Sequence, residues 1–410
     1  MKNQITNMLK IILPILLLAA APGITTPATP KATPKTAPEK VSPVCDPYVQ
    51  NPEPDGFTVL WETNMDAMAW VEVAPDDGSH FYSRDRKRYF DLRGLGNQYI
   101  GTMHKIRIDG LEPGTTYRYR IMMKGVLDFT GSGNPRYTKP WGNDVYRGHP
   151  YTFTTPAADR DTLRFDIYND IHQRDTDLDR LMKAAAKEKP DFVLFNGDMT
   201  SSLISRDLIR DTWLRTAAAN LEGKTPMYVL RGNHELRGRH ASAWMDYNDL
   251  PEGLPHRTAS WGKFFLIFLD TLEDKPDSDI EYGGTMLSEP YLKAQAEWLE
   301  KVVESDGCRK AAVRLVFAHI PPDRNGWQGD RNVEEYFVPI LNKAGITAMF
   351  CGHLHQWRID NPGQRSSANF PVVINPNCRR MEVTASPESL SLKVFDLDGA
   401  QTQSWSCPAR

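Results

Sequence analysis

Five short clusters of His, Asp and Asn residues occur along this chain, and together they could bind two divalent metal ions. In chain order they are Asp170-Ile171-His172, Gly197-Asp198, Gly232-Asn233-His234-Glu235, His319 and Gly352-His353-Leu354-His355. Carboxylate oxygen, amide oxygen and neutral imidazole are donors that Mn, Zn and Fe accept, and one carboxylate can bridge two ions. The clusters therefore predict a two-metal centre, with one ionisable His left over for acid–base chemistry.

The spacing inside the clusters supports this prediction. In Asp170-Ile171-His172 and in His353-Leu354-His355, alternate residues would lie on the same side of an extended segment. Gly197, Gly232 and Gly352 each precede a candidate ligand, at a place where a side chain would block a tight turn.

Each cluster follows a predicted buried strand. The predicted strands span residues 163–168, 191–196, 227–230, 313–317 and 347–351, with another at 264–269 and a β-rich tail at 372–395. Predicted helices lie at 177–187, 203–220, 291–304 and 333–343. Strands that alternate with helices form an α/β domain, whose sites lie outside the carboxyl ends of the strands. We therefore expect β-sheets flanked by helices, with all five clusters at one crevice.

Taken one at a time, the clusters also have ordinary structural explanations. Asp170 could cap a turn, Gly197-Asp198 is a common turn pair, and His353 and His355 could be solvated. Taken together they favour a metal centre, because five of the ten histidines fall in them. An inactive relative with the same fold would still keep much of this pattern.

An all-β domain is expected before the α/β domain. Phe57, Val59 and Trp61 alternate with other residues, as in a strand with one buried face. A Pro-Gly turn then leads into a strand on which Tyr117 and Tyr119 share one face, a segment that resembles the tyrosine corner of fibronectin type III domains. This domain contains no cluster of ligands, and it could shape access to the site or bind a glycan or partner.

The beginning of the chain has the pattern of a secretion signal. Lys2 and Lys10 precede an apolar run over residues 11–21, which is short for a membrane span. We expect a signal peptide over residues 1–22, an extended Pro/Thr/Lys-rich linker over 23–43, and a secreted or periplasmic protein with no stable membrane span after cleavage. The alternative is an uncleaved membrane anchor.

The composition argues against two features, a nucleic-acid-binding surface and a structural zinc site. The 410 residues carry a net charge of -3, which gives no sign of a nucleic-acid-binding surface. The five cysteines show no C-x-x-C spacing, so a structural zinc site is not expected, and disulfide pairing stays open.

These motifs resemble those of the calcineurin-like metallophosphoesterase superfamily. Gly232-Asn233-His234-Glu235, Val316-Phe317-Ala318-His319 and Gly352-His353-Leu354-His355 follow its motifs position by position. The two-domain layout is similar to that of purple acid phosphatases. The resemblance implies a fibronectin type III-like domain of their N-terminal type over residues 44–157. It also implies a layered metallophosphoesterase sandwich over residues 158–410.

The resemblance also implies a role for each site residue. One metal would be held by Asp170, His172 and His355, the other by Asn233, His319 and His353, and Asp198 would bridge them. His234 would be the catalytic residue near the leaving group, and Glu235 would orient the Asn233-His234 turn.

Two positions depart from the purple subgroup. That subgroup has Asp-x-Gly in its first motif and a Tyr three residues after the Asp of its second, whereas this chain has His172 and Ser201. The tyrosinate that colours the iron(III) enzymes is missing, so we expect a colourless enzyme with Mn, Zn or Fe.

The resulting hypothesis is a phosphoesterase that hydrolyses phosphate monoesters of small molecules or polymers. A hydroxide held by the two metals would attack phosphorus, and His234 would protonate the leaving oxygen or hydrogen-bond the phosphoryl group. The alternatives are a phosphodiesterase acting on nucleotides or lipid headgroups, and a non-catalytic surface-binding protein on a relic fold.

Overall fold

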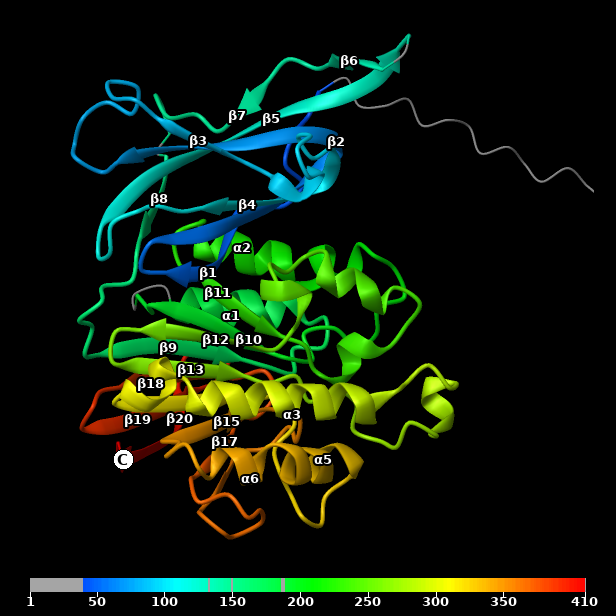
Figure 1. Ribbon diagram of the computed structural model, residues 1–410, viewed down its shortest axis with the longest axis vertical. Helices are drawn as coiled ribbons and strands as arrows, with labels where there is room; N and C mark the ends of the chain where they lie inside the picture. Colours follow the sequence, from blue (N-terminus) through cyan, green and yellow to red (C-terminus); the bar gives the residue numbers. More distant parts are fainter. Residues whose placement is uncertain (1–39, 132, 149, 186–188, 410) are drawn as a thin grey trace, which may run out of the picture. The chain divides into compact units, whose positions relative to one another are not determined.

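The structure is a computed structural model that describes residues 40–131, 133–148, 150–185 and 189–409 (Figure 1). The predicted signal peptide and linker residues 23–39 lie outside this range, as do residues 186 and 187 of the first predicted helix. Within the described range, no helix is long and apolar enough to cross a membrane. All five cysteines are free thiols, and Cys351 is buried.

The first domain is built from antiparallel strands, as predicted. They are β1 (Tyr48–Glu53), β2 (Gly56–Pro75), β3 (Lys87–Phe90), β4 (Gly101–Ile108), β5 (Thr116–Thr130), β6 (Asn134–Tyr137), β7 (Trp141–Gly142) and β8 (Tyr151–Thr154), with a short 3-10 helix η1 (Leu92–Gly94). Strand β2 pairs with β1 and β4 along its first half and with β3 and β5 along its second half. This double pairing lets the strands enclose one apolar core.

Two features fix the course of the chain in this domain, one at its beginning and one at the turn before β5. Val41, in the predicted linker, is buried in the core, and Pro43 pairs with Thr63, so the chain joins the domain before residue 44. The Tyr117 hydroxyl accepts a hydrogen bond of 2.9 Å from the Glu112 N–H, which closes the turn where the sequence indicated a tyrosine corner.

The second domain contains two six-stranded sheets. The first has the order β11-β10-β9-β18-β19-β20 and comprises β9 (Leu163–Tyr168), β10 (Phe192–Asn196), β11 (Met227–Leu230), β18 (Arg380–Ala385), β19 (Ser389–Phe395) and β20 (Gln401–Pro408). The second has the order β12-β13-β14-β15-β17-β16 and comprises β12 (Arg257–Trp261), β13 (Phe264–Phe268), β14 (Val313–Phe317), β15 (Ala348–Cys351), β16 (Arg358–Asp360) and β17 (Val372–Ile374). Strands β9 to β11 are parallel to one another, as are β13, β14, β15 and β17.

Helices cover the outer face of each sheet (Figure 1), which confirms the predicted α/β layers. On the first sheet lie α1 (Asp175–Ala185), the π-helix η2 (Arg210–Leu214) and α2 (Arg215–Leu221). On the second lie α3 (Ser288–Glu304), α4 (Asp306–Lys310), α5 (Gln328–Tyr336) and α6 (Val338–Leu341). The inner faces of the two sheets share one apolar core. Short 3-10 helices are η3 (Asn233–Leu236), η4 (Ala241–Met245), η5 (Pro251–Gly253) and η6 (Ile280–Tyr282).

Two predicted helices are wrong in detail. The helix expected over residues 203–220 begins several residues later, because Leu203 pairs its backbone with the loop after η3. Its N–H donates to Arg237 O at 2.7 Å, and its carbonyl accepts from His240 N at 2.9 Å. The helix expected over 333–343 is split into α5 and α6, because Pro339 has no N–H to continue the hydrogen-bond ladder.

The first domain forms hydrogen bonds with one segment of the second domain, residues 244–249. The Tyr48 hydroxyl and the Lys105 ammonium donate hydrogen bonds of 2.5 to 2.9 Å to backbone carbonyls of this segment. Gln50 binds the same segment through both ends of its amide. Because these groups are largely buried, the segment is held in one conformation.

His104 generates a prediction about stability. Its side chain is fully buried, packs at a tilt against the Trp61 ring and lies 3.2 Å from Thr63 Oγ1. Burial lowers the pKa of His104 from its ordinary value to about 4. Between about pH 6.5 and pH 4 the unfolded chain binds the proton more strongly, so native stability should fall as pH falls, by about 3 kcal/mol at most.

Urea unfolding at pH 7 and pH 5 checks this prediction. His104→Leu should remove part of the pH dependence, and the exposed His80→Leu should retain it. An unchanged pH dependence in His104→Leu would contradict the assignment.

Candidate metal centre

All five clusters lie just beyond the carboxyl ends of parallel strands, after β9, β10, β11, β14 and β15. The structure brings the seven predicted ligands and His234 to one place. Ligand atoms converge in three overlapping groups: Asp170 with His172 and His355; His172 with Asp198 and His234; and Asp198 with His319 and His353. Within each group the atoms lie within 4.8 Å of one another.

The first group pairs a buried carboxylate with two imidazoles near the surface. His355 Nε2 lies 3.1 Å from Asp170 Oδ1 and 3.2 Å from His172 Nε2. His172 Nε2 is 3.9 Å from Asp170 Oδ1. Three donor atoms from two distant parts of the chain therefore face a common point.

The second group is deeper. His319 Nε2 lies 3.1 Å from Asp198 Oδ2, and both side chains are buried. Asn233 joins the group through its Oδ1 atom, 3.2 Å from His353 Nδ1. Asp198 Oδ2 is also 4.0 Å from His172 Nε2, so this carboxylate reaches both groups.

His234 stands beside the groups with a defined orientation. Its Nδ1 atom is 2.7 Å from the Ser201 carbonyl. A carbonyl can only accept, so Nδ1 carries a proton and Nε2 is the atom that faces the site. That Nε2 lies 3.9 Å from Asp198 Oδ2 and 3.4 Å from Arg237 Nη1.

The backbone of the cluster is unusual. Asp170, His172, Asp198, His353 and His355 have φ angles of 53°, 48°, 54°, 69° and 54°, in the left-handed region that non-glycine residues rarely adopt. The prediction that Asp-x-His and His-x-His run as extended segments is therefore wrong. The chain turns sharply at these residues and aims each side chain inward, and such strain is typical of functional sites.

The three glycines are required by close approach. A Cβ atom on Gly232 would lie 2.2 Å from Asp198 Oδ1, and one on Gly352 would lie 2.8 Å from Asp170 Oδ2. Gly197 has a φ of 87°, and a Cβ there would lie 2.5 Å from His319 Nδ1. Any side chain at these positions would displace a candidate ligand.

Glu235 joins the loops that carry the ligands. Its buried carboxylate accepts hydrogen bonds of 2.7 to 2.8 Å from the backbone N–H groups of Gly232, Asp198 and Thr200. The sequence suggested that Glu235 orients the Asn233-His234 turn. The structure shows that it also holds the Asp198 loop.

Burial and charge act together on the titratable groups. Burial works to lower the pKa of His319, but the carboxylates of Asp198 and Asp170 raise it to about 10. For Asp198 burial opposes ionisation, and the His319 imidazole holds its pKa well below the ordinary value. Burial lowers the pKa of His353 to about 4. The two carboxylates thus favour the protonated form of His319, whereas burial favours the neutral form of His353.

The residues fit divalent metal ions. His319 Nδ1 lies 2.8 Å from the Asn196 carbonyl, which leaves Nε2 as the free ring nitrogen. This Nε2 atom is buried and lies 3.1 Å from Asp198 Oδ2 and 4.0 Å from Asp170 Oδ1. A buried ring nitrogen that faces two carboxylates is suited to hold a cation with them.

Sequence reasoning missed the residues that orient Asp170. Asn169 Nδ2 donates a hydrogen bond of 2.6 Å to Asp170 Oδ2, and Asn375 Nδ2 donates one of 2.6 Å to Asn169 Oδ1. Asn169 directly precedes a candidate ligand, which is a usable signal. Asn375 lies more than 200 positions away, and nothing local marks it.

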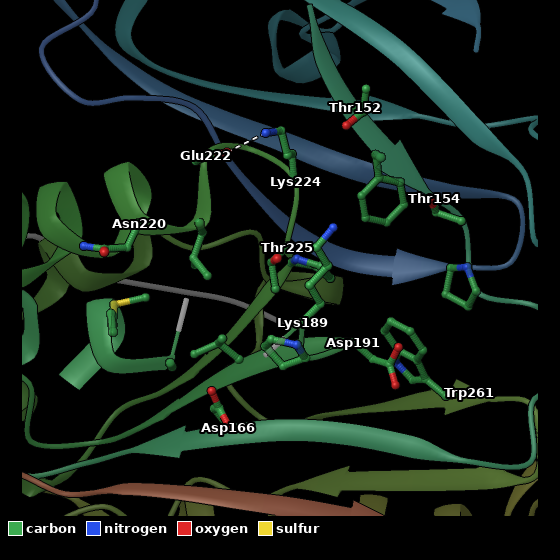
Figure 2. A pocket seen from close by; sticks show the side chains of 18 of the residues that line it. Thr152, Thr154, Asp166, Lys189, Asp191, Asn220, Glu222, Lys224, Thr225 and Trp261 are labelled. Atoms are coloured by element: carbon green, nitrogen blue, oxygen red, sulfur yellow. Dashed lines mark hydrogen bonds and ion pairs between the residues drawn. The ribbon is translucent and has the colours of Figure 1, made fainter. Parts of the chain in front are cut away.

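A second hollow lies at the opposite ends of the strands. It has a volume of about 570 Å³ and is lined by residues of β8 and by the segments that precede β10 and β11. Figure 2 shows Asp191, Lys189 and Lys224 around it. None of the predicted ligands lines this hollow.

The layered sheets and the ligand cluster at their carboxyl edge define a metallophosphoesterase domain. Residues 163–357 match the calcineurin-like phosphoesterase family, and residues 46–144 match the purple acid phosphatase N-terminal domain. These two matches follow the order of the two predicted domains and confirm the resemblance seen in the motifs.

Two known proteins illustrate the similarity. A serine/threonine-protein phosphatase of Danio rerio, CPPED1, is 24% identical over 181 residues, which cover 41% of this chain and 55% of that protein. The match thus spans about half the length of this curated relative. The structure of purple acid phosphatase PPD1 from yellow lupin (Lupinus luteus) seeds aligns with a TM-score of 0.62 and 15% identity, covering 88% of this chain and 73% of that one. This likeness establishes the fold.

The glycine contacts generate a prediction about metal binding. Gly232→Ala should weaken metal binding by about 10–100-fold, because the new Cβ would push Asp198 away. Gly232 has a φ of -93°, so the effect is steric rather than conformational. Elemental analysis after dialysis measures the metal content, and circular dichroism checks the fold.

Gly307→Ala in α4 is the matched control, since its nearest contact is the Phe265 ring at 3.1 Å. Full metal content in Gly232→Ala would contradict the role of Asp198 at the centre.

Proposed function

We propose that the chain is a metal-dependent phosphoesterase that hydrolyses phosphate monoesters. The observation that carries this proposal is the convergence of seven oxygen and nitrogen donors, two of them buried carboxylates, with an oriented His beside them. The match to the calcineurin-like phosphoesterase family supports it.

The donors divide into two sets. Asp170, His172 and His355 would hold one ion, Asn233, His319 and His353 would hold the other, and Asp198 would belong to both. The chemistry that two divalent ions supply when bound is Lewis-acid activation of the phosphoryl group and of water. Ser201 stands where the purple subgroup has its Tyr, so we propose Mn, Zn or Fe without a tyrosinate ligand.

His234 is the proposed general acid. The Ser201 carbonyl holds Nδ1 at 2.7 Å, so Nε2 faces the space beside Asp198, and its N–H points there when the ring is doubly protonated. That proton can be delivered to the leaving oxygen of an ester bound at the cluster. The hydrogen bond to Ser201 prevents ring rotation and preserves this orientation.

Two alternative functions differ from this proposal in their chemistry. A phosphodiesterase would use the same donors and differ in the surrounding loops. A non-catalytic binding protein on a relic fold does not require a complete donor set, and all seven donors are present here.

The proposal is tested by assays with paired substrates. The purified protein should hydrolyse an aryl phosphate monoester faster than the corresponding diester. Removal of metal by a chelator should abolish the activity, and Mn, Zn or Fe should restore it. Faster diester hydrolysis would favour the phosphodiesterase, and absence of both activities in the metal-loaded protein would reject the proposal.

Two variants separate metal binding from proton transfer in the same assays. Asn233→Ala should lower metal content, because it removes one donor. His234→Ala should keep its metal and lose about 100- to 10,000-fold in turnover, because only the proton donor is missing. Near-normal hydrolysis by both variants would contradict the residue roles.

We further propose that the protein is exported and acts in a secreted or periplasmic setting. The motivation is the basic start and apolar run over residues 11–21, followed by a Pro/Thr/Lys-rich stretch. N-terminal sequencing of the protein from its native source should find a start beyond the apolar run. Detection of the protein with an intact Met1 in a soluble cell extract would contradict export.

A further inference from the structure

A pocket of about 840 Å³ opens beside His234. Its walls come from residues 236–242, which follow the Gly-Asn-His motif, and from residues 281–286, which include the end of η6. Ser201 and Ser202 complete the wall on the side of the β10 loop. A leaving group that receives a proton from His234 must extend into this neighbourhood.

Arg237 lies between the pocket and the cluster of candidate metal ligands. Its Nη2 atom lies 2.9 Å from Glu273 and 3.1 Å from Asp274, both buried. Its Nη1 atom lies 2.9 Å from Glu281 and 3.4 Å from His234 Nε2. Three carboxylates therefore hold the guanidinium in place, with one edge toward the reacting centre.

The outer wall of the pocket is also held rigidly. Ala241 and Ser242 begin η4, and the segment that follows is the one gripped by the first domain at residues 244–249. Before η4, Leu203 pairs its backbone with Arg237 and His240. The pocket is thus formed before a ligand arrives, which lowers the entropic cost of binding.

The chemistry of the walls suits a polar organic group. Ser201, Ser202, Ser242 and Thr285 line the pocket together with charged residues such as Arg239 and Glu281, while Leu236 and Met286 offer apolar surface. The volume falls within the range of about 300–1,000 Å³ that is usual for small-molecule sites. A folded protein substrate would contact the rim and leave most of this interior empty.

We propose that this pocket is the leaving-group site, and that it takes the organic part of a small-molecule phosphate monoester. That part is polar and rich in hydroxyl groups, as in a sugar phosphate. This inference rests on the proposed phosphoesterase function and names its substrate class.

The test blocks the pocket from an exposed position. Ser242 is exposed, so Ser242→Trp fills the pocket without disturbing the core. The kcat/KM for a sugar phosphate should fall by about tenfold or more, because the indole occupies the space of the sugar. The kcat/KM for methyl phosphate should change by less than about twofold, since its leaving group is too small to reach the wall. Ser404→Trp, on the exposed strand β20, is the matched control and should alter neither value.

Each outcome points to one conclusion. Equal values for both esters in Ser242→Trp and wild type overturn the pocket assignment and leave the proposed function intact. Equal losses for both esters also overturn it. A phosphopeptide that is hydrolysed faster than the sugar phosphate, with no effect of Ser242→Trp, overturns the small-molecule class. Failure of the metal-loaded wild type on every ester overturns the proposed function, and this inference with it.

Discussion

Two buried carboxylates, Asp170 and Asp198, impose the constraint on which the rest of the structure depends. They share the imidazoles of His172 and His319 at distances of 3.1 to 4.0 Å. Buried negative charge is costly unless it is paired, so this arrangement requires cations or donors on every side. The imidazoles, the amide of Asn169 and the backbone N–H groups around them meet that requirement.

The surrounding strands and loops must offset the free energy that it costs to hold these groups close together. Five ligand candidates adopt left-handed backbone conformations, each of which costs about 1–3 kcal/mol, and three glycines allow the loops to touch. The strands supply the compensation: the shared core between the two sheets fixes where each strand ends. Glu235 then ties two of the loops together, so the motif segments behave as one unit.

The first domain supports one wall of the pocket beside His234. It contributes no ligand, yet Tyr48, Gln50 and Lys105 hold residues 244–249 behind the pocket wall. Its contacts give a rigid boundary to a pocket whose reacting edge is defined by Arg237 and His234. The second domain therefore carries the candidate ligands, and the first domain contacts the segment behind the pocket.

The sequence by itself determined the ligand types, the strand ends that carry them and the α/β layers, because strand burial and short motifs are local properties. It could not show the left-handed turns at Asp170 and His353, which only the packing of several loops imposes. Nor could it show that Asn375 supports Asn169 or that Leu203 leaves the predicted helix to pair with Arg237. Those contacts join residues that are distant in the chain, and only the tertiary structure decides which of them meet.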